Sequence, residues 1–216
     1  MANSELRDIV ESVKAYLELE KASGLKECYF TRISELDSLK AKVSACDKCG
    51  LSKTRKNVVF GSGSPKAKLM FVGEAPGADE DKRGLPFVGR AGQLLTKIIE
   101  SMGLAREDVY IANILKCRPP ENRPPFPEEI LACRDNVRKQ IEVIRPRVIC
   151  TLGKFASQTL LNTETTISDL RGKFSQYCGI KVMPTFHPAY LLRNPHDKKL
   201  VWADMKMVMG ELKRNK

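Results

Sequence analysis

The sequence predicts an α/β fold in which helices cover both faces of a central parallel sheet, with a helical extension at the N-terminus. Two observations support this prediction. Short apolar runs alternate with helical stripes from residue 57 onward, whereas residues 1–40 show helical spacing only. A length of 216 residues suits one domain with an appendage. We place the extension at residues 1–41 and the α/β domain at residues 42–216.

Each element of the α/β domain has its own signal. Four short apolar runs are typical of buried strands: Lys68–Gly73, Val109–Leu115, Arg147–Leu152 and Ile180–Phe186. Four segments with apolar residues at helical spacing alternate with them: Gly89–Met102, Pro127–Ile144, Lys154–Leu161 and Asp197–Lys213. Residues 118–127 are rich in proline, so they predict a rigid loop. In the extension, helical spacing joins Leu6, Ile9, Val10, Val13 and Leu17, and again Ile33, Leu36, Leu39 and Val43.

Charge is unevenly distributed along the chain. The net charge is +11, yet residues 1–40 carry −2, so the remaining 176 residues carry +13. A basic body favours a polyanionic partner, most simply a nucleic acid. No apolar run approaches the roughly 20 residues that a membrane-spanning helix needs, and the N-terminus lacks the order of a secretory signal. We expect a soluble cytoplasmic protein with no membrane partner.

Four of the seven cysteines have spacing that suits a metal site. Cys46 and Cys49 form a C-x-x-C pair, and Cys117 and Cys133 follow after gaps of 67 and 15 residues. Such a pair places two thiolates on one side of a metal, and two more from distant loops complete a tetrahedral set. The spacing suits zinc or a [4Fe–4S] cluster equally. Alternatively, Cys117 and Cys133 are ordinary buried cysteines.

Residues that follow the predicted strands should converge on one cleft, because ligands of parallel sheets bind beyond the carboxyl ends of the strands. The turn after the first strand, residues 73–81, is rich in glycine and carboxylates, which disfavours phosphate and fits a neutral, hydrogen-bonding ligand. Asn113 lies at the end of the second strand. His187 follows the fourth and can present an N–H group. Phe87, in a Pro/Gly frame, either stacks on a planar base or belongs to the core.

Five ordered segments together resemble the family 4 uracil-DNA glycosylases, the iron–sulfur branch of the uracil-DNA glycosylase superfamily. The segments are GEAPGADED, GLPFVGRAGQLL, VYIANILKCRPPENRPP, RGKF and FHPAYLLRNP. With the Cys46/Cys49 pair, the resemblance covers residues 42–212. Residues 1–40 lie outside it, and their simplest interpretation is a helical extension that docks a protein partner.

The resemblance implies a three-layer α/β/α sandwich around a parallel four-stranded sheet. It also implies a [4Fe–4S] cluster on Cys46, Cys49, Cys117 and Cys133. The implied activity is DNA repair: a monomer acts on single- or double-stranded DNA of the nucleoid, flips out deoxyuridine and hydrolyses its N-glycosidic bond.

The resemblance also implies roles for individual residues. Phe87 stacks on the uracil ring, Asn113 pairs with its O4 and N3–H edge, and His187 donates to O2 of the departing base. Glu74, Ala75 and Pro76 line the sugar and base side. Two further roles are implied, in which Glu80 excludes the thymine methyl and Leu191 fills the gap left in the base stack. The best-known uracil glycosylases carry a water-activating aspartate where this chain has Ala75, which leaves Glu74 or the backbone for that task.

Three other hypotheses remain open at this point. A superfamily relative traps uracil-DNA through a histidine on a basic loop, but residues 118–123 contain no histidine. A zinc-stabilised nucleic-acid-binding module explains the cysteines and the charge, but it leaves Asn113, Phe87 and His187 without a role. A broader glycosylase would also act on other deaminated bases, such as xanthine or hypoxanthine.

Overall fold

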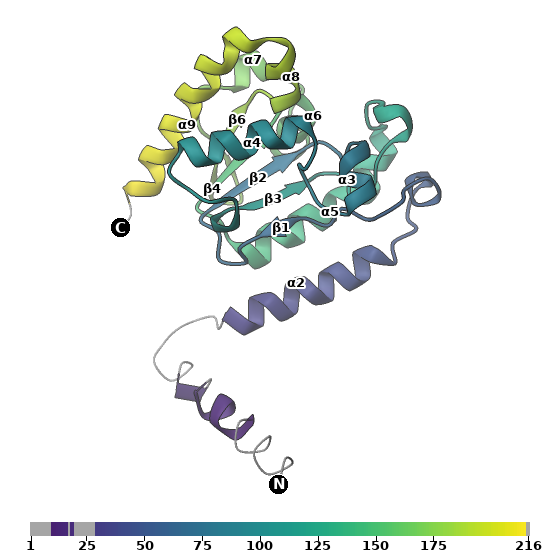
Figure 1. Ribbon diagram of the computed structural model, residues 1–216, viewed down its shortest axis with the longest axis vertical. Coiled ribbons are helices and arrows are strands. Elements are labelled where there is room, and N and C mark those ends of the chain that lie inside the picture. Colours follow the sequence, from purple (N-terminus) through teal and green to yellow (C-terminus); the bar gives the residue numbers. More distant parts are fainter. Residues whose placement is uncertain (1–9, 17, 20–28, 215–216) are drawn as a thin grey trace.

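The computed structural model of the chain describes residues 10–16, 18–19 and 29–214 (Figure 1). Residues 10–16 and 18–19 are helical, as the spacing of Val10 and Val13 predicts. Leu6, Ile9 and Leu17, from the same predicted stripe, lie outside the described residues. None of the helices in the described ranges is long and apolar enough to cross a membrane.

A six-stranded sheet forms the centre of the part of the chain that the structure describes, in the order β1-β3-β2-β4-β6-β5. The strands are β1 (Ser62–Gly63), β2 (Leu69–Gly73), β3 (Tyr110–Asn113), β4 (Val148–Leu152), β5 (Ser175–Tyr177) and β6 (Ile180–Thr185). The inner four, β3-β2-β4-β6, are parallel to one another, which confirms the predicted parallel four-stranded sheet. The edge strands β1 and β5 pair antiparallel and were not predicted, because they are short and lack an apolar run.

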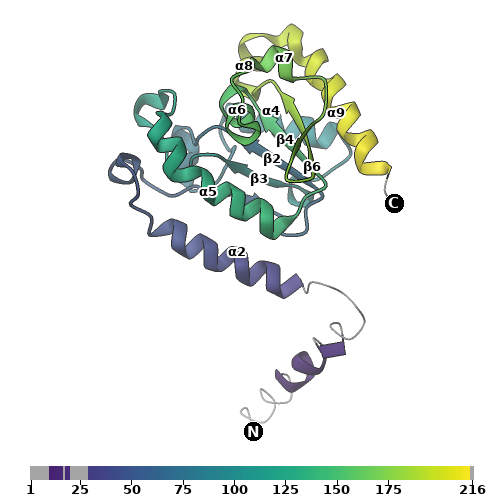
Figure 2. The ribbon, with the colours of Figure 1, turned by 180° about the vertical axis from the view of Figure 1, so that it is seen from behind.

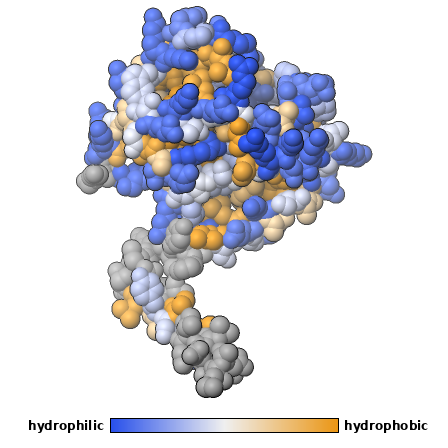
Figure 3. Space-filling model, viewed as in Figure 1, coloured by the Kyte–Doolittle hydropathy of each residue, from blue (hydrophilic) through white to orange (hydrophobic). Residues whose placement is uncertain are grey.

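Helices cover both faces of this sheet, so the predicted three-layer α/β/α arrangement is confirmed (Figures 1 and 2). Apolar residues of α2, α5 and α6 form one core with one face of the strands, and those of α4, α8 and α9 form a second core with the other. The helices are α2 (Tyr29–Ser44), α3 (Ala78–Arg83), α4 (Arg90–Ser101), α5 (Pro127–Ile144), α6 (Lys154–Leu161), α7 (Ile167–Leu170), α8 (Pro188–Arg193) and α9 (Lys198–Lys213). On the face seen in Figure 3, hydrophilic residues predominate and surround smaller hydrophobic patches.

Helix α2 is the outermost layer, and it packs along α5 (Figure 2). Its buried side chains are Leu36, Leu39 and Val43, three of the four residues of the predicted stripe. The predicted boundary between residues 41 and 42 falls within α2. The division into an extension and a domain therefore stays a prediction.

Candidate active site and cysteine site

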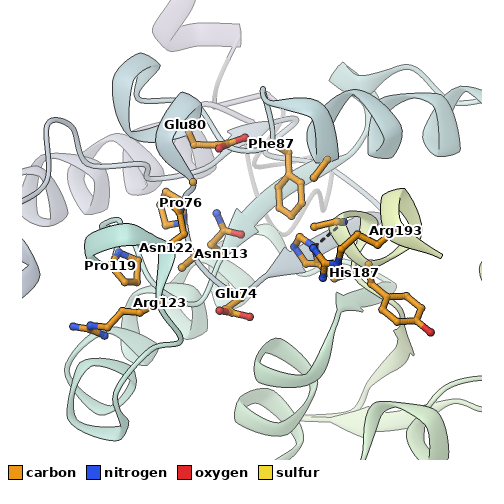
Figure 4. A pocket seen from close by; sticks show the side chains of 15 residues that line it. Glu74, Pro76, Glu80, Phe87, Asn113, Pro119, Asn122, Arg123, His187 and Arg193 are labelled. Carbon is orange, nitrogen blue, oxygen red and sulfur yellow. Dashed lines mark hydrogen bonds between the residues drawn. The ribbon is translucent and has the colours of Figure 1, made fainter. Parts of the chain in front are cut away.

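A cavity of about 520 Å³ opens at the carboxyl ends of the parallel strands (Figure 4). Strand β2 leads into Glu74, Ala75 and Pro76, β3 ends at Asn113, and β6 leads into His187. The structure brings all seven predicted substrate-binding residues to this cavity: Glu74, Ala75, Pro76, Glu80, Phe87, Asn113 and His187.

Asn113 presents an unpaired acceptor to the cavity. The residue is only 1% exposed, and its side-chain Oδ1 is a buried oxygen for which the described residues offer no hydrogen-bond partner. An unpaired buried polar atom costs about 1–3 kcal/mol, so the site is prepared for a donor that the protein does not supply. Gly73, opposite Asn113 in the β2–β3 register, makes room: a Cβ there would collide with Asn113 Oδ1 and lie 2.6 Å from Phe87 Cζ.

Phe87 is held by a constrained loop between α3 and α4. Its φ of 51° lies in the left-handed region, which a non-glycine residue adopts at a cost. Glu80 Oε1 accepts hydrogen bonds from the next two amides, Val88 N at 2.8 Å and Gly89 N at 2.9 Å. Gly92 lets the first turn of α4 pack closely against the backbone of Phe87, because a Cβ there would overlap the Phe87 carbonyl. Glu80 therefore fixes the loop that presents the Phe87 ring.

His187 faces Phe87 across the cavity as a neutral ring. The two ring centroids are 5.6 Å apart (Figure 4). Burial, reinforced by the nearby Arg193 charge and opposed by Glu80, lowers the pKa of His187 from 6.5 to about 4. Its Nδ1 accepts a hydrogen bond from Ala189 N at 3.0 Å, which leaves the proton on Nε2. The side chain is thus a fixed N–H donor.

Glu74 supplies a carboxyl group to the cavity. In Figure 4 it lies below Asn113 and His187. Burial raises the pKa of Glu74 from 4.5 to about 7. This group therefore changes charge near neutral pH, which makes it a candidate for handling water or a proton.

The proline-rich loop contributes cavity residues that the sequence analysis did not assign. Asn122 and Arg123 line the cavity from this loop, and Arg193 does so from α8. Asn122 has a left-handed φ of 54°, and its Oδ1 accepts from Arg118 Nε at 2.8 Å. Proline content predicted the rigidity of the loop but gave no signal for its path toward the cavity.

The structure corrects the prediction for Leu191. This side chain is fully buried in the core between α8, α4 and α9, so it does not reach the surface as a DNA wedge would. The next residue, Leu192, is 38% exposed. In a helix of only six residues, the sequence pattern did not show which of the two adjacent leucines faces the core.

The four predicted ligand cysteines line one small hollow between the end of α2 and the segment after it, residues 116–117 after β3, and α5. Cys117 Sγ accepts from Arg55 Nη1 at 3.3 Å, and Cys133 Sγ accepts from Lys116 N at 3.3 Å. Burial raises the pKa of the Cys117 and Cys133 thiols, and the neighbouring cations Arg55 and Lys116 act in the opposite direction. Within the described ranges, no three His, Cys, Asp or Glu side chains are grouped closely enough to hold a single metal ion.

Comparison with known proteins identifies the family. Residues 60–206 match the family model of the uracil DNA glycosylase superfamily. The chain is 47% identical to a type-4 uracil-DNA glycosylase of Archaeoglobus fulgidus, in an alignment that covers 83% of this chain and 94% of the relative. The chain belongs to the type-4 family of this superfamily.

Further relatives of the type-4 family match equally large parts of the chain. The type-4 uracil-DNA glycosylase of Saccharolobus solfataricus is 47% identical, with 83% of this chain and 88% of the relative covered. That of Thermotoga maritima is 43% identical, with coverages of 86% and 98%. The family resemblance inferred from the five sequence motifs is thereby confirmed.

Proposed function

We propose that this chain is a DNA repair glycosylase that flips deoxyuridine out of DNA and hydrolyses its N-glycosidic bond, leaving an abasic site. The single observation that carries the proposal is the buried, unpaired Oδ1 of Asn113 in a cavity that also holds an aromatic ring and a neutral imidazole. The names of the type-4 relatives support the same activity.

Asn113 distinguishes uracil from cytosine by complementary hydrogen bonds. Oδ1 accepts from uracil N3–H, and the amide NH₂ group donates to O4. Cytosine presents an acceptor at N3 and a donor at N4, so it would leave Oδ1 unpaired. That mismatch costs about 1–3 kcal/mol for each buried group left without a partner. Phe87 provides the surface on which the ring stacks.

His187 stabilises the departing base. As the glycosidic bond breaks, negative charge develops on uracil O2, and Nε2–H of the neutral ring donates to it. The donor is already oriented by the Ala189 amide, so little reorganisation accompanies the reaction. Preorganised donors of this kind are worth about 3 kcal/mol in the transition state.

Glu74 orients the attacking water in this mechanism. The equivalent of the usual aspartate is Ala75, so Glu74 is the remaining carboxyl group on the segment that follows β2. A sugar that already carries positive charge needs little activation of the nucleophile, and a half-buried carboxylate is sufficient. Glu80 lines the same cavity, and we propose that it excludes the methyl group of thymine.

A [4Fe–4S] cluster on Cys46, Cys49, Cys117 and Cys133 belongs to the same proposal. The donor set fits an anionic sulfur-rich group, because Arg55, the Lys116 amide and Asn136 Nδ2 all point to cysteine sulfurs. When bound, the cluster would link the segment after α2 to the loop after β3 and to α5. The resemblance to family 4 favours it over zinc. A monomeric state and action on nucleoid DNA in the cytoplasm rest on charge and resemblance alone.

Base release from end-labelled oligonucleotides tests the activity. Single- and double-stranded substrates carry U, T or C, and Asn113→Ala and His187→Ala serve as variants. We expect alkali-labile cleavage at U alone, with a loss of about 10²–10³-fold in His187→Ala. Tight binding of uracil-DNA without release would identify a binder or trap instead. No preference for U would overturn the proposal.

A further inference from the structure

Behind the cavity, a buried polar network surrounds the backbone of Asn113. Lys116 Nζ donates to the Asn113 carbonyl at 2.8 Å and to Gln140 Oε1 at 2.6 Å. Gln140 Nε2 in turn donates to Phe60 O at 2.9 Å and to Tyr110 Oη at 3.1 Å. Lys116 is 1% exposed and Gln140 is fully buried. The network joins β3, α5 and the segment before β1 without contact with solvent.

The position of Asn113 explains why such a network is needed. The β2–β3 ladder ends at the Gly73–Asn113 pair, and its continuation is the Ile114 N to Gly73 O bond at 2.9 Å. The Asn113 carbonyl therefore lies at the end of the ladder in a buried environment. A buried carbonyl without a donor is costly, and Lys116 reaches back three residues to supply one.

Burial of a lysine needs a strong reason, since lysine is rarely fully buried without a partner. Within the described residues, no carboxylate forms an ion pair with Lys116. Its two acceptors are the Asn113 carbonyl and the Gln140 amide oxygen, and its own backbone amide donates to Cys133. The side chain thus fixes the peptide that carries Asn113, while the Asn113 side chain itself is left unpaired for a ligand.

We propose that Lys116 and Gln140 are positioning residues for uracil recognition, which act by holding the Asn113 backbone so that its amide meets the edge of the base. This inference rests on the proposed function and adds two residues to it that do not touch the base. A displacement of Asn113 by even about 1 Å is expected to lower the rate by 10- to 100-fold, because recognition and reaction depend on exact alignment.

A double-mutant cycle tests the proposal. Single-turnover uracil release is measured for the iron-loaded wild type, Lys116→Met, Asn113→Ala and the double variant, with visible absorbance and thermal melting as checks on loading and folding. Lys116→Met should lose about 10- to 100-fold in the wild-type background. In the Asn113→Ala background, the further loss should be below about twofold, because residues that act as a unit are not additive.

Two further variants make the result decisive. Gln140→Met removes one of the two acceptors of Lys116, at a position on α5 that is not adjacent in sequence to a cysteine. It should give the same non-additive loss if Lys116→Met fails to fold or to load iron. Lys139→Met changes the exposed neighbour of Gln140 on α5 and should retain wild-type activity. Equal losses of the Lys116 or Gln140 variant in both backgrounds would show a structural role only and overturn the proposal.

The wild-type measurement distinguishes a failure of the proposed function from a failure of the role proposed for Lys116 and Gln140. Absence of uracil release by the wild type would overturn the proposed function and, with it, this inference. If the wild type releases uracil, two results would overturn the inference alone. One is additive losses in the double-mutant cycle, and the other is unchanged activity in a folded, iron-loaded Lys116→Met variant.

Discussion

At the scale of single residues, burial shifts the pKa values of Glu74 and His187, two ionisable groups of the cavity, in opposite directions. The pKa of His187 falls to about 4, and the pKa of Glu74 rises to about 7. Both shifts favour the neutral form, because a charge loses solvation when it is buried. His187 is therefore a neutral donor at any pH above about 4, whereas Glu74 gains its charge only as the pH rises through about 7.

The pH dependence of uracil release should follow Glu74. We expect the single-turnover rate to rise with an apparent pKa of about 7, because the carboxylate form orients water, and to show no step near 6.5 from His187. Glu74→Gln should remove this rise and leave a low, flat profile between pH 5.5 and 8.5. A wild-type rate that is constant over this range would contradict the role of Glu74.

Sequence alone located seven of the 15 residues that line the cavity, and part of this set follows from topology, because side chains at the ends of parallel strands converge. Asn113 and His187 were found in this way, and the pattern around Phe87 supplied the aromatic ring. Leu191 was assigned wrongly, because a six-residue helix has too few positions to define its buried face. Lys116 gave no signal as a cavity-supporting residue, because its partners lie 3 and 24 residues away and only the fold brings Gln140 beside it.

At the scale of elements, the short helix α3 holds the loop of Phe87. Glu80→Ala removes the acceptor for Val88 N and Gly89 N, so Phe87 should no longer be held in its left-handed conformation. We expect the catalytic efficiency on uracil-DNA to fall by about tenfold, the usual effect of a lost hydrogen bond to a charged group. Steady-state kinetics on U- and T-containing DNA measure the effect.

Two variants control this prediction. Glu80→Gln keeps an acceptor oxygen and should recover part of the loss, and Lys82→Ala changes an exposed side chain of the same helix. Thymine release by Glu80→Ala would support the additional role in methyl exclusion. Unchanged kinetics in Glu80→Ala would show that the loop holds Phe87 without this carboxylate.

The long helices and the apolar inner strands were predictable, and the edge strands and the shortest helices were not. The bounds of α5 and α6 agree with those predicted, because proline, glycine and helical spacing mark them. The edge strands β1 and β5 and the helices α3, α7 and α8 were missed. They have two to six residues, which is too few to establish a period, and tertiary contacts decide their conformation.

At the scale of the whole molecule, the cysteine site joins segments that are far apart in the sequence. Cys46 and Cys49 follow α2, whereas Cys117 and Cys133 belong to the loop after β3 and to α5. We expect Cys46→Ser to lose the visible absorbance of a cluster. Its melting temperature should fall by about 5 °C or more, which corresponds to a few kcal/mol for a chain of this size.

Cys178→Ser is the matched control for this cysteine variant. Cys178 is exposed in the turn between β5 and β6 and does not line the hollow of the four predicted ligand cysteines, so its replacement should leave both absorbance and melting temperature unchanged. Unchanged iron content in Cys46→Ser would remove Cys46 from the ligand set.

A crystal structure of the protein with uracil, soaked in or released from an oligonucleotide, is the most direct test of the central claim. The account predicts the uracil ring against Phe87, with N3 within hydrogen-bond distance of Asn113 Oδ1 and O2 facing His187 Nε2. Uracil bound elsewhere, or bound in this cavity with Asn113 Oδ1 still unpaired, would contradict the account.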